Sequence, residues 1–247
     1  MNIYYNNVDV NILVNGHSVA KYYKDGKTYI EAKDGSEYEI QIKNNYFNRV
    51  LAVASVDGLN VLTGKLASTE DGGYVINPYN SYKIKGFRYS DEKVGAFKFT
   101  SKKNSYAEEK QVSENCGIIG VRIFNDAAAY TYTTCAHDNT QDYTLKSNFI
   151  LKANTNNMYK DMSANCLSST NNVVNCNFDM GSTWGSSKDS KVTSTEFERG
   201  YVVNSFDFYY ASRNALIEMG VIEESTPKVS FPKSFPNYAT PPKNWIG

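Results

Sequence analysis

The sequence predicts an all-β fold, an antiparallel β-sandwich of jelly-roll type. The chain of 247 residues contains twenty Tyr and twelve Phe, with many Asn and only six Pro, which is typical of strands joined by polar turns. Its first half is divided into short runs of β-branched and aromatic residues with turn signals about every 8–12 residues. We expect about eight or nine strands. No segment of helical periodicity lies between them, which argues against a parallel α/β sheet.

The first strands are separated by Asp-Gly turns. Residues 19–23 lead into Lys24-Asp25-Gly26-Lys27, and residues 28–32 lead into Lys33-Asp34-Gly35-Ser36. Asp-Gly between aromatic or β-branched runs is a strong hairpin signal, because Gly adopts the positive φ that a tight turn needs. Two successive turns of this kind predict a run of antiparallel strands.

The next two strands differ in their pattern of polarity. Residues 37–43 alternate strictly, with Tyr38, Ile40 and Ile42 on one face, so this strand is expected to be half-buried. Residues 49–56 are apolar almost throughout, which predicts a central strand covered on both faces and ending at Asp57-Gly58.

Five further apolar runs are expected to form strands in the first half of the chain. They are residues 59–62, 74–76, 82–84, 94–100 and 117–124. In the fourth of these runs Phe97 and Phe99 point to one face and Lys98 to the other.

The remainder of the chain differs in composition. After a core of residues 1–125, we expect an Asn/Ser/Thr-rich insertion over 126–195 that buries little apolar surface. Residues 196–222 complete the core with a strand at 201–210 and a short helix at 213–219. Ser212 is the expected N-cap of this helix, and Gly220 the left-handed residue that ends it.

The C-terminal segment, residues 223–247, is predicted to be an extended arm. It contains five of the six prolines of the chain, which disfavour regular hydrogen-bonded structure. Four aromatic residues alternate with these prolines, and we expect them to pack on the sandwich or on a neighbouring subunit. These candidate interface residues are Phe231, Phe235, Tyr238 and Trp245.

Charge and hydropathy exclude several classes of function. Lys plus Arg and Asp plus Glu both number 26, so no net field favours nucleic acid or an anionic bilayer. No apolar run approaches the ~20 residues of a membrane span. The first residues, MNIYYNNVDV, lack the basic and apolar regions of a signal peptide. We therefore predict no nucleic-acid partner, no membrane and an intracellular origin.

The cysteines predict free thiols rather than a disulfide scaffold. Cys116, Cys135, Cys166 and Cys176 form no C-x-x-C pair, and four are too few for such a scaffold in a chain of this length. One bridge between Cys166 and Cys176, which would close a short loop, remains an open alternative.

No motif predicts catalysis, a metal or a cofactor. His17 lies in an expected turn, and Cys135 with His137 lacks the second ligand pair of a zinc site. The segment Gly181-Ser182-Thr183-Trp184-Gly185 has Thr where a nucleophile elbow has Ser. The sequence therefore predicts a protein without catalytic, cofactor-binding or metal-binding residues.

Several motifs of the core resemble those of a diffuse family of uncharacterised β-sandwich proteins of bacteria and large DNA viruses. The match covers about residues 22–124 and 206–220. The residues that carry it are Arg49-Val50, Ser55-Val56-Asp57-Gly58-Leu59, Gly64-Lys65, Gly73-Tyr74-Val75, Pro78, Gly86-Phe87-Arg88, Ala96-Phe97-Lys98-Phe99, Ser105-Tyr106, Gly117-Ile118-Ile119-Gly120, Phe208-Tyr209-Tyr210, Arg213 and Met219-Gly220. They are turn glycines and core aromatics, so the resemblance implies a fold and no reaction.

These observations together predict a non-enzymatic structural subunit of a viral particle, such as a minor capsid or vertex protein. It would be located in the virion and would bind neighbouring protein subunits as a homo- or hetero-oligomer. The alternative is a carbohydrate- or surface-binding β-sandwich module that uses exposed Tyr side chains and Trp184. A third hypothesis is a hydrolase with dispersed carboxylates.

Overall fold

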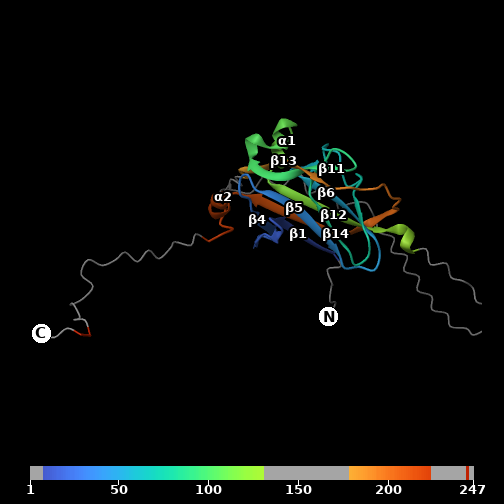
Figure 1. Ribbon diagram of the computed structural model, residues 1–247, viewed down its shortest axis with the longest axis horizontal. Helices are drawn as coiled ribbons and strands as arrows, with labels where there is room; N and C mark the ends of the chain where they lie inside the picture. The colour runs from blue at the N-terminus through green and yellow to red at the C-terminus, as the bar shows by residue number, and fades with distance from the viewer. Residues whose placement is uncertain (1–7, 131–177, 224–242, 245–247) are drawn as a thin grey trace, which may run out of the picture.

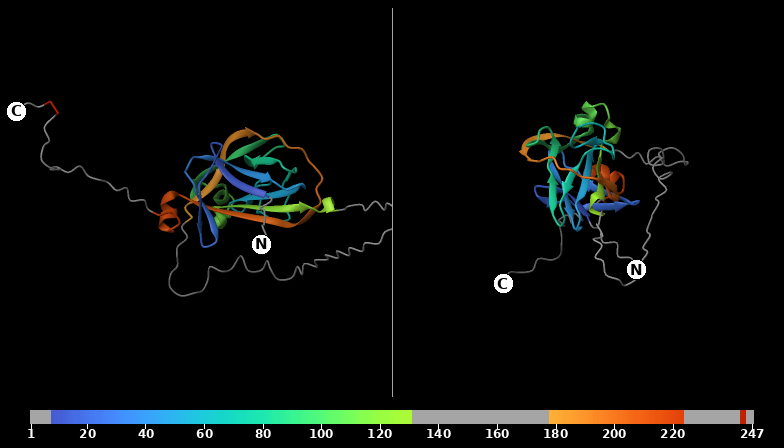
Figure 2. Two further views of the ribbon diagram at one scale, coloured as in Figure 1. Left: turned by 90° about the horizontal axis from the view of Figure 1, so that it is seen from below. Right: turned by 90° about the vertical axis from the view of Figure 1, so that its right-hand side faces the viewer.

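The computed structural model describes residues 8–130, 178–223 and 243–244. Within these residues the chain forms two β-sheets that pack face to face, as Figures 1 and 2 show. The predicted all-β sandwich is confirmed at this level. The strand pairs are antiparallel in both sheets except for one parallel pair, β4 with β14.

The first sheet contains the first described strand of the chain, β1. Its main path runs through β10 (Gly86–Arg88), β11 (Lys93–Ser101), β5 (Glu37–Asn44), β1 (Val8–Val14) and β2 (His17–Ser18). Two more strands join it off this path, β13 (Met180–Asp189) beside β11 and β9 (Ser81–Ile84) beside β5.

The second sheet contains the last strand of the chain, β14. Its path runs through β3 (Lys21–Lys24), β4 (Lys27–Glu31), β14 (Arg199–Ala211), β12 (Ile118–Asp126), β6 (Val50–Val56) and β7 (Leu59–Asn60), with β8 (Tyr74–Ile76) beside β6. The left view of Figure 2 shows β12 in green and β14 in orange next to each other in this layer.

Short helices lie at the ends of strands. Between β11 and β12 the chain forms η1 (Lys102–Asn104), α1 (Tyr106–Glu109) and η2 (Ser113–Asn115), and η3 (Ala127–Tyr130) follows β12. The sequence pattern did not predict these turns of helix, because each is too short to show a period. The predicted C-terminal helix is confirmed as α2 (Arg213–Glu218), capped by the Ser212 hydroxyl and ended by Gly220 at φ +64°.

Alternating side chains build the core between the sheets. Tyr38, Ile40 and Ile42 of β5 are buried as predicted, and Phe97 and Phe99 of β11 are buried on the same side. Tyr38 stacks on Phe99 with ring centroids 4.1 Å apart. Strand β6 is covered on both faces, as its continuous apolar run predicted.

The two early Asp-Gly turns have different roles. Asp25 and Gly26 both have positive φ, and they connect β3 to β4 as a hairpin. The turn containing Gly35 instead connects β4 in one sheet to β5 in the other. The hairpin predicted there is therefore wrong, because turn chemistry fixes the local bend and not the sheet that the next strand enters.

Strand β13 lies inside the range that the composition assigned to a loop-rich insertion. Its sequence, MGSTWGSSKD, has few β-branched residues, yet it pairs with β11 along nearly its whole length. Figure 1 shows it at the edge of the first sheet beside α1. Pairing with an apolar neighbour explains this strand better than its own propensity does.

Candidate functional site

The predicted interface residues lie outside the described part of the chain. These interface residues are Phe231, Phe235, Tyr238 and Trp245. The candidate ligand and disulfide residues Cys135, His137, Cys166 and Cys176 also lie outside it. The site they were expected to form stays a prediction. Among the described residues, no group of three or more His, Cys, Asp or Glu is placed to hold a metal ion. None of the helices in these described ranges has the length and apolar character needed to cross a membrane.

A hydrogen-bonded carboxylate lies at one end of the core. Asp57 follows β6 with φ +53° and is 1% exposed. Its Oδ1 accepts hydrogen bonds from the Gly117 amide at 2.9 Å and the Tyr210 hydroxyl at 2.5 Å. Its Oδ2 accepts one from the Ser182 amide at 2.7 Å. Three donors thus compensate the burial of this acid.

The network continues from Asp57 across the interior of the sandwich. Ser182 Oγ lies 2.8 Å from the Tyr210 hydroxyl and 2.7 Å from the Tyr38 hydroxyl. Tyr210 has a single hydroxyl proton, which it donates to Asp57, so Tyr210 accepts from Ser182 and Ser182 accepts from Tyr38. Asp57 directly follows β6 and Tyr210 lies in β14, both strands of the second sheet, whereas Ser182 and Tyr38 belong to the first. The chain of donors therefore connects the two sheets.

Burial dominates the electrostatics of this network. It raises the pKa of Asp57 to about 6, although the hydrogen bonds from Tyr210, Gly117 and Ser182 favour the charged form. Burial, and after it the charge of Asp57, raises the pKa of both Tyr210 and Tyr38 well above the usual value. Both phenols therefore keep their protons and remain donors at neutral pH.

The Asp57 network is a structural feature and is closed to ligands. Asp57, Tyr210, Ser182 and Tyr38 are each exposed by 1% or less. None of these four side chains lines any of the three hollows described below. A substrate would have to displace the core to reach them. We assign the network to holding the sheets together.

The nearby thiol is also closed to solvent chemistry. Cys116 is 5% exposed, and its Sγ lies 3.3 Å from Ser105 Oγ. Burial raises the pKa of this thiol, so the nucleophilic thiolate is disfavoured.

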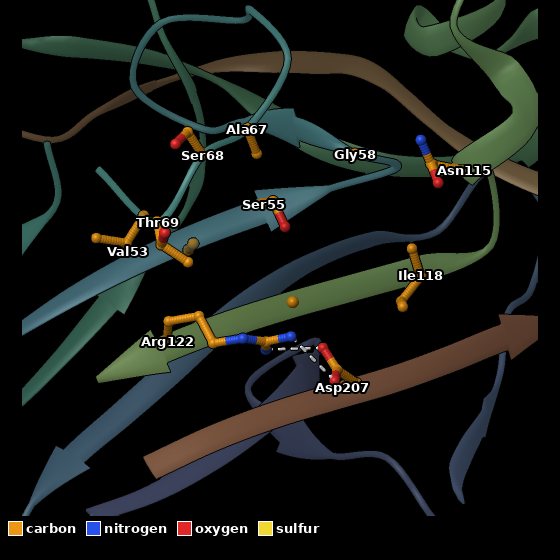
Figure 3. A pocket seen from close by; sticks show the side chains of 12 residues that line it. Val53, Ser55, Gly58, Ala67, Ser68, Thr69, Asn115, Ile118, Arg122 and Asp207 are labelled. Carbon is orange, nitrogen blue, oxygen red and sulfur yellow. Dashed lines mark hydrogen bonds and ion pairs between the residues drawn. The ribbon is translucent and has the colours of Figure 1, made fainter. Parts of the chain in front are cut away.

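A small hollow lies on the outer face of the second sheet, under the loop that contains Ser68 and Thr69 (Figure 3). Its volume of about 210 Å³ is below the ~300–1,000 Å³ of typical ligand pockets. Arg122 and Asp207, on neighbouring strands, form two hydrogen bonds of 2.8 and 3.2 Å within it. Because this charge pair is satisfied internally, the hollow has little to offer a charged ligand.

A second hollow, of about 730 Å³, is lined by two arginines that are already bound. Arg49 donates to Asp126 at 2.7 Å, and Arg199 donates to the carbonyl groups of Thr69 and Asp71. These guanidinium groups fix loops to the sheet, and Lys191 is the third basic residue that lines the hollow.

A third hollow, of about 680 Å³, separates the edges of the two sheets. Residues 9–11 of β1 line one side, residues 205–209 of β14 the other, and the β3–β4 hairpin closes one end. Lys21 crosses it and donates to the Val10 carbonyl at 3.0 Å and to Asn11 Oδ1 at 2.8 Å. Burial lowers the pKa of Lys21. The hollow is thus a groove between two strand edges, which we call the edge groove.

Strand β14 pairs unequally on its two sides within the described residues. Strand β12 pairs with it from Ile118 opposite Tyr209 to Asp126 opposite Arg199. On the other side β4 pairs only with residues 208–211. Within the described ranges, no strand pairs with residues 202–207 on that side. We call residues 202–207 the open edge, and its last residues line the edge groove.

The open edge lacks the usual protection against pairing. Exposed edges normally carry Lys or other charged residues, or Pro, and these discourage a second strand. Residues 202–206 read VVNSF, with no charge and no proline. Val203 is an extra residue in the register with β12, a bulge, and its side chain is 38% exposed. A bulge bends the strand, but it leaves main-chain groups available. The open edge is the described feature best suited to contact another polypeptide.

A pair of exposed aromatic rings lies elsewhere, at the β13 edge of the first sheet. Trp184 is 37% exposed and Tyr89 is 52% exposed, with ring centroids 5.9 Å apart. Trp184 lies flat against Gly95, where a Cβ atom would come within 2.2 Å of its ring. The structure therefore brings the predicted Trp184 next to Tyr89 on the surface.

Sequence reasoning missed both the Asp57 network and the open edge. Asp57 was assigned only a turn role, because Asp-Gly dominates the local pattern, and nothing near it in sequence indicates Ser182 or Tyr210. The absence of charge from residues 200–206 was visible in the sequence. Its meaning depends on knowing which edge β4 leaves uncovered.

Comparison with known proteins gives no match: no family model, no curated protein and no solved structure matches this chain. The resemblance to β-sandwich proteins of bacteria and large DNA viruses therefore stays a prediction.

Proposed function

We propose that this protein is a non-enzymatic structural subunit that acts through contacts with other proteins. The observation that carries the proposal is the open edge of β14, residues 202–207. We propose a viral particle as the assembly, with the chain as a minor capsid or vertex protein located in the virion. The proposal requires no cofactor and no metal.

Main-chain hydrogen bonding gives the open edge its capacity to bind. Alternate residues of an edge strand direct N–H and C=O groups outward, so six residues present roughly six such groups. An added strand would satisfy these groups and cover Val203 at the same time. Strand addition of this kind obtains affinity from the main chain and specificity from alternate side chains.

The rigid core favours binding at this edge. The C-terminal half of β14 is fixed by β4, by β12 and by the bonds of Tyr210 to Asp57 and Ser182. A partner strand therefore meets an edge that is already extended, which lowers the entropy lost on association.

The viral assignment draws on the fold and on the sequence. Double-sheet jelly rolls are common in viral capsids, and the two-sheet architecture supports a jelly-roll connectivity as part of this proposal. The predicted resemblance to proteins of large DNA viruses points in the same direction.

Purification of the native assembly tests the proposed function. Size-exclusion chromatography with light scattering should place the wild-type chain in a particle much larger than its 27.7 kDa, and imaging should show its position. Val203→Lys, which places a charge on the open edge, should release a folded chain from the particle. Leu66→Lys, at a side chain that is 60% exposed on a loop, is the matched control and should remain incorporated. A wild-type chain that is found free in its native source would refute the proposal.

A carbohydrate-binding module is the second candidate, and the Trp184–Tyr89 pair favours it. Two adjacent exposed rings can stack on the apolar faces of sugars, and the Tyr89 hydroxyl lies 2.7 Å from Ser187 Oγ beside them. A glycan array should then show selective binding that Trp184→Ala abolishes and that Phe47→Ala, at an exposed ring that contacts Tyr46 instead, leaves intact. Binding that both variants retain, or no binding by the wild type, contradicts this candidate.

A further inference from the structure

We infer that a surface patch of three aromatic rings on the sandwich binds residues 231–236 of the C-terminal segment of the same chain. The rings are those of Trp184, Tyr89 and Tyr106, and we call them the aromatic patch. The inference goes beyond the proposed function, because the contact lies within one chain and needs neither the open edge nor an assembly.

The rings of the aromatic patch are held in place before any ligand binds. The Trp184 ring lies directly above Gly95, where a Cβ atom would come within 2.2 Å of it, and it stacks on buried Phe87 with centroids 5.7 Å apart. The Tyr106 ring stands at 78° to the Trp184 ring, and Tyr89 lies 5.9 Å from Trp184 between centroids. Trp184 and Tyr89 remain 37% and 52% exposed. A ligand therefore meets a preformed apolar surface, which lowers the entropy lost on binding.

The free polar groups of the aromatic patch are able to donate hydrogen bonds. Among the residues that the structure describes, the indole N–H of Trp184 and the hydroxyl of Tyr106 have no hydrogen-bond partner. An indole N–H can only donate, whereas a hydroxyl can donate or accept. The patch therefore suits an apolar ligand whose polar groups are mainly acceptors. A proline-rich peptide has this chemistry, because its carbonyl groups accept and each proline lacks an N–H.

The C-terminal segment contains this chemistry in a short stretch. Residues 231–236 read Phe-Pro-Lys-Ser-Phe-Pro, with two Phe-Pro pairs. A residue that precedes proline is biased towards an extended conformation, so Phe231 and Phe235 are predicted to lie on an extended backbone. Proline-rich segments of this kind bind to aromatic-lined surfaces and lose little entropy, because their extended form exists before binding.

The bonding of the carboxylate beside the patch favours a peptide over a sugar. Glu37 lies next to Gly185, and its carboxylate is already bonded to the Lys188 ammonium at 2.8 Å and to the Ser186 amide at 2.7 Å. Sugar hydroxyls donate as well as accept, so a sugar would compete with these bonds for its acceptor. A proline-rich main chain needs no such acceptor.

The C-terminal segment begins close to the strand that carries the patch. The Ser212 amide, at the start of α2, donates to Asp179 Oδ1 at 3.0 Å, and Trp184 lies five residues further along the chain, or about 17 Å. The chain returns to α2 after its last turn, because the Ile222 amide donates to the Leu216 carbonyl at 3.3 Å. Leu216 is four helical residues from Ser212, or about 6 Å. The path from Ile222 to Trp184 is therefore short.

The length of the segment allows it to cover this path. Residues 224–235 span up to about 37 Å when a proline-rich chain is extended, which is longer than the path along α2 and β13. A tether of this length gives an effective concentration of about a millimolar, so a weak contact is sufficient for docking. The eleven residues that follow position 236 include two of the predicted interface aromatics, which stay available for a neighbouring subunit.

Acrylamide quenching of Trp184 fluorescence in the full chain tests the inference. The chain has two tryptophans, so Trp245→Phe leaves Trp184 as the only fluorescent indole. Quenching in this background should be weak, because the docked segment covers the ring. Phe231→Ala combined with Phe235→Ala should lower the equilibrium constant for docking by about tenfold or more and so increase quenching. Ile246→Ala, in the same segment but outside the docked stretch, is the matched control and should leave quenching unchanged.

The same measurement identifies the occupant of the patch. Quenching should be independent of protein concentration, because a tethered segment is not diluted. Quenching that increases on dilution would assign the segment to a second copy and overturn docking within one chain. Equal quenching with and without the two phenylalanines also overturns the inference, and protection of Trp184 by a glycan would then identify a sugar as the occupant.

A disulfide tests the position of the docked segment independently of fluorescence. Ser187 Oγ lies 2.7 Å from the Tyr89 hydroxyl, at the rim of the patch. In a chain whose cysteines at positions 135, 166 and 176 are replaced by Ser, Ser187→Cys with Ser234→Cys should oxidise to an intramolecular disulfide. Ser18→Cys with Ser234→Cys is the matched control, because Ser18 lies on β2 at the other end of the first sheet, and its oxidation should be about tenfold slower or more. Equal rates for the two pairs would mean that the segment has no fixed site on the patch.

Discussion

Replacing Asp57 with Asn should remove a pH dependence that the buried carboxylate gives to the stability of the fold. The folded-state pKa of Asp57 is raised from 3.8 to about 6 by burial. A raised pKa means that the folded protein binds the proton more tightly than the unfolded chain. Its contribution to stability is therefore complete below pH ~4 and is lost as the pH rises through 6.

The magnitude follows from the two pKa values. Between pH 8 and pH 5 the protonation of Asp57 should increase the free energy of unfolding by about 1.4 kcal/mol. The facing groups Tyr210, Tyr38 and Cys116 have raised pKa values and stay neutral over this range. Glu37 has a pKa lowered to about 2 by its bonds to Lys188 and Ser186. The Glu37 carboxylate stays charged in the folded protein, so its contribution to the free energy of unfolding falls only below pH ~5.

For Asp57→Asn, the change of the unfolding free energy with pH is more informative than its absolute value. The amide keeps one oxygen for Gly117 and Tyr210, but its NH₂ group faces the Ser182 N–H. This leaves a buried donor unsatisfied at a cost of about 1–3 kcal/mol. At pH 8, removal of the buried charge of Asp57 increases the free energy of unfolding by about 3 kcal/mol, which offsets this cost. These two effects nearly cancel, whereas only the wild type has a titrating carboxyl at this position.

Urea denaturation at pH 5, 6, 7 and 8 measures this difference. The wild type should gain stability toward pH 5 relative to Asp57→Asn, and Asp34→Asn, at an exposed turn position, should retain the wild-type slope. Equal slopes for the wild type and Asp57→Asn would refute the electrostatic account of the core.

Three further outcomes are expected. Tyr210→Phe removes the hydroxyl that donates to Asp57, so it should cost about 1–3 kcal/mol in urea unfolding and, by raising the pKa of Asp57 further, steepen the gain toward pH 5; an unchanged profile would contradict the network. Gly95→Ala places a Cβ 2.2 Å from the Trp184 ring and should cost about 1–3 kcal/mol in thermal unfolding, whereas an unaffected melting temperature would mean that the ring is free to move. Deletion of residues 226–247 should leave a folded monomer that fails to enter the native particle, and normal incorporation of the truncated chain would disprove the predicted arm contacts.

The core and the candidate surface make different demands on β14. Its C-terminal part, with Phe208 and Tyr210, is buried between the sheets and bonded to Asp57. Its N-terminal part includes the open edge, whose side chains are exposed or only partly buried. A charge at Val203 should therefore change association with little effect on stability, whereas a change at Tyr210 should do the reverse. This separation makes the two roles testable in one strand.

The sequence by itself determined the strands whose patterns are local. The strict alternation of residues 37–43 determined which face of that strand is buried. The continuous apolar run of residues 49–56 determined that this strand is central and covered on both faces. The cap at Ser212 and the left-handed Gly220 fixed the last helix. Such signals depend on neighbours within a few residues, because side-chain direction and turn geometry are set along the backbone.

Only the tertiary structure decided how these elements meet. Strand β13 exists because β11 pairs with it, and Asp57 tolerates burial because Gly117, Ser182 and Tyr210 reach it from distant positions. The open edge arises because β4 stops after four residues of parallel pairing with β14. Hydrogen bonds between strands join residues that are far apart in sequence, so no local pattern records which edge remains uncovered.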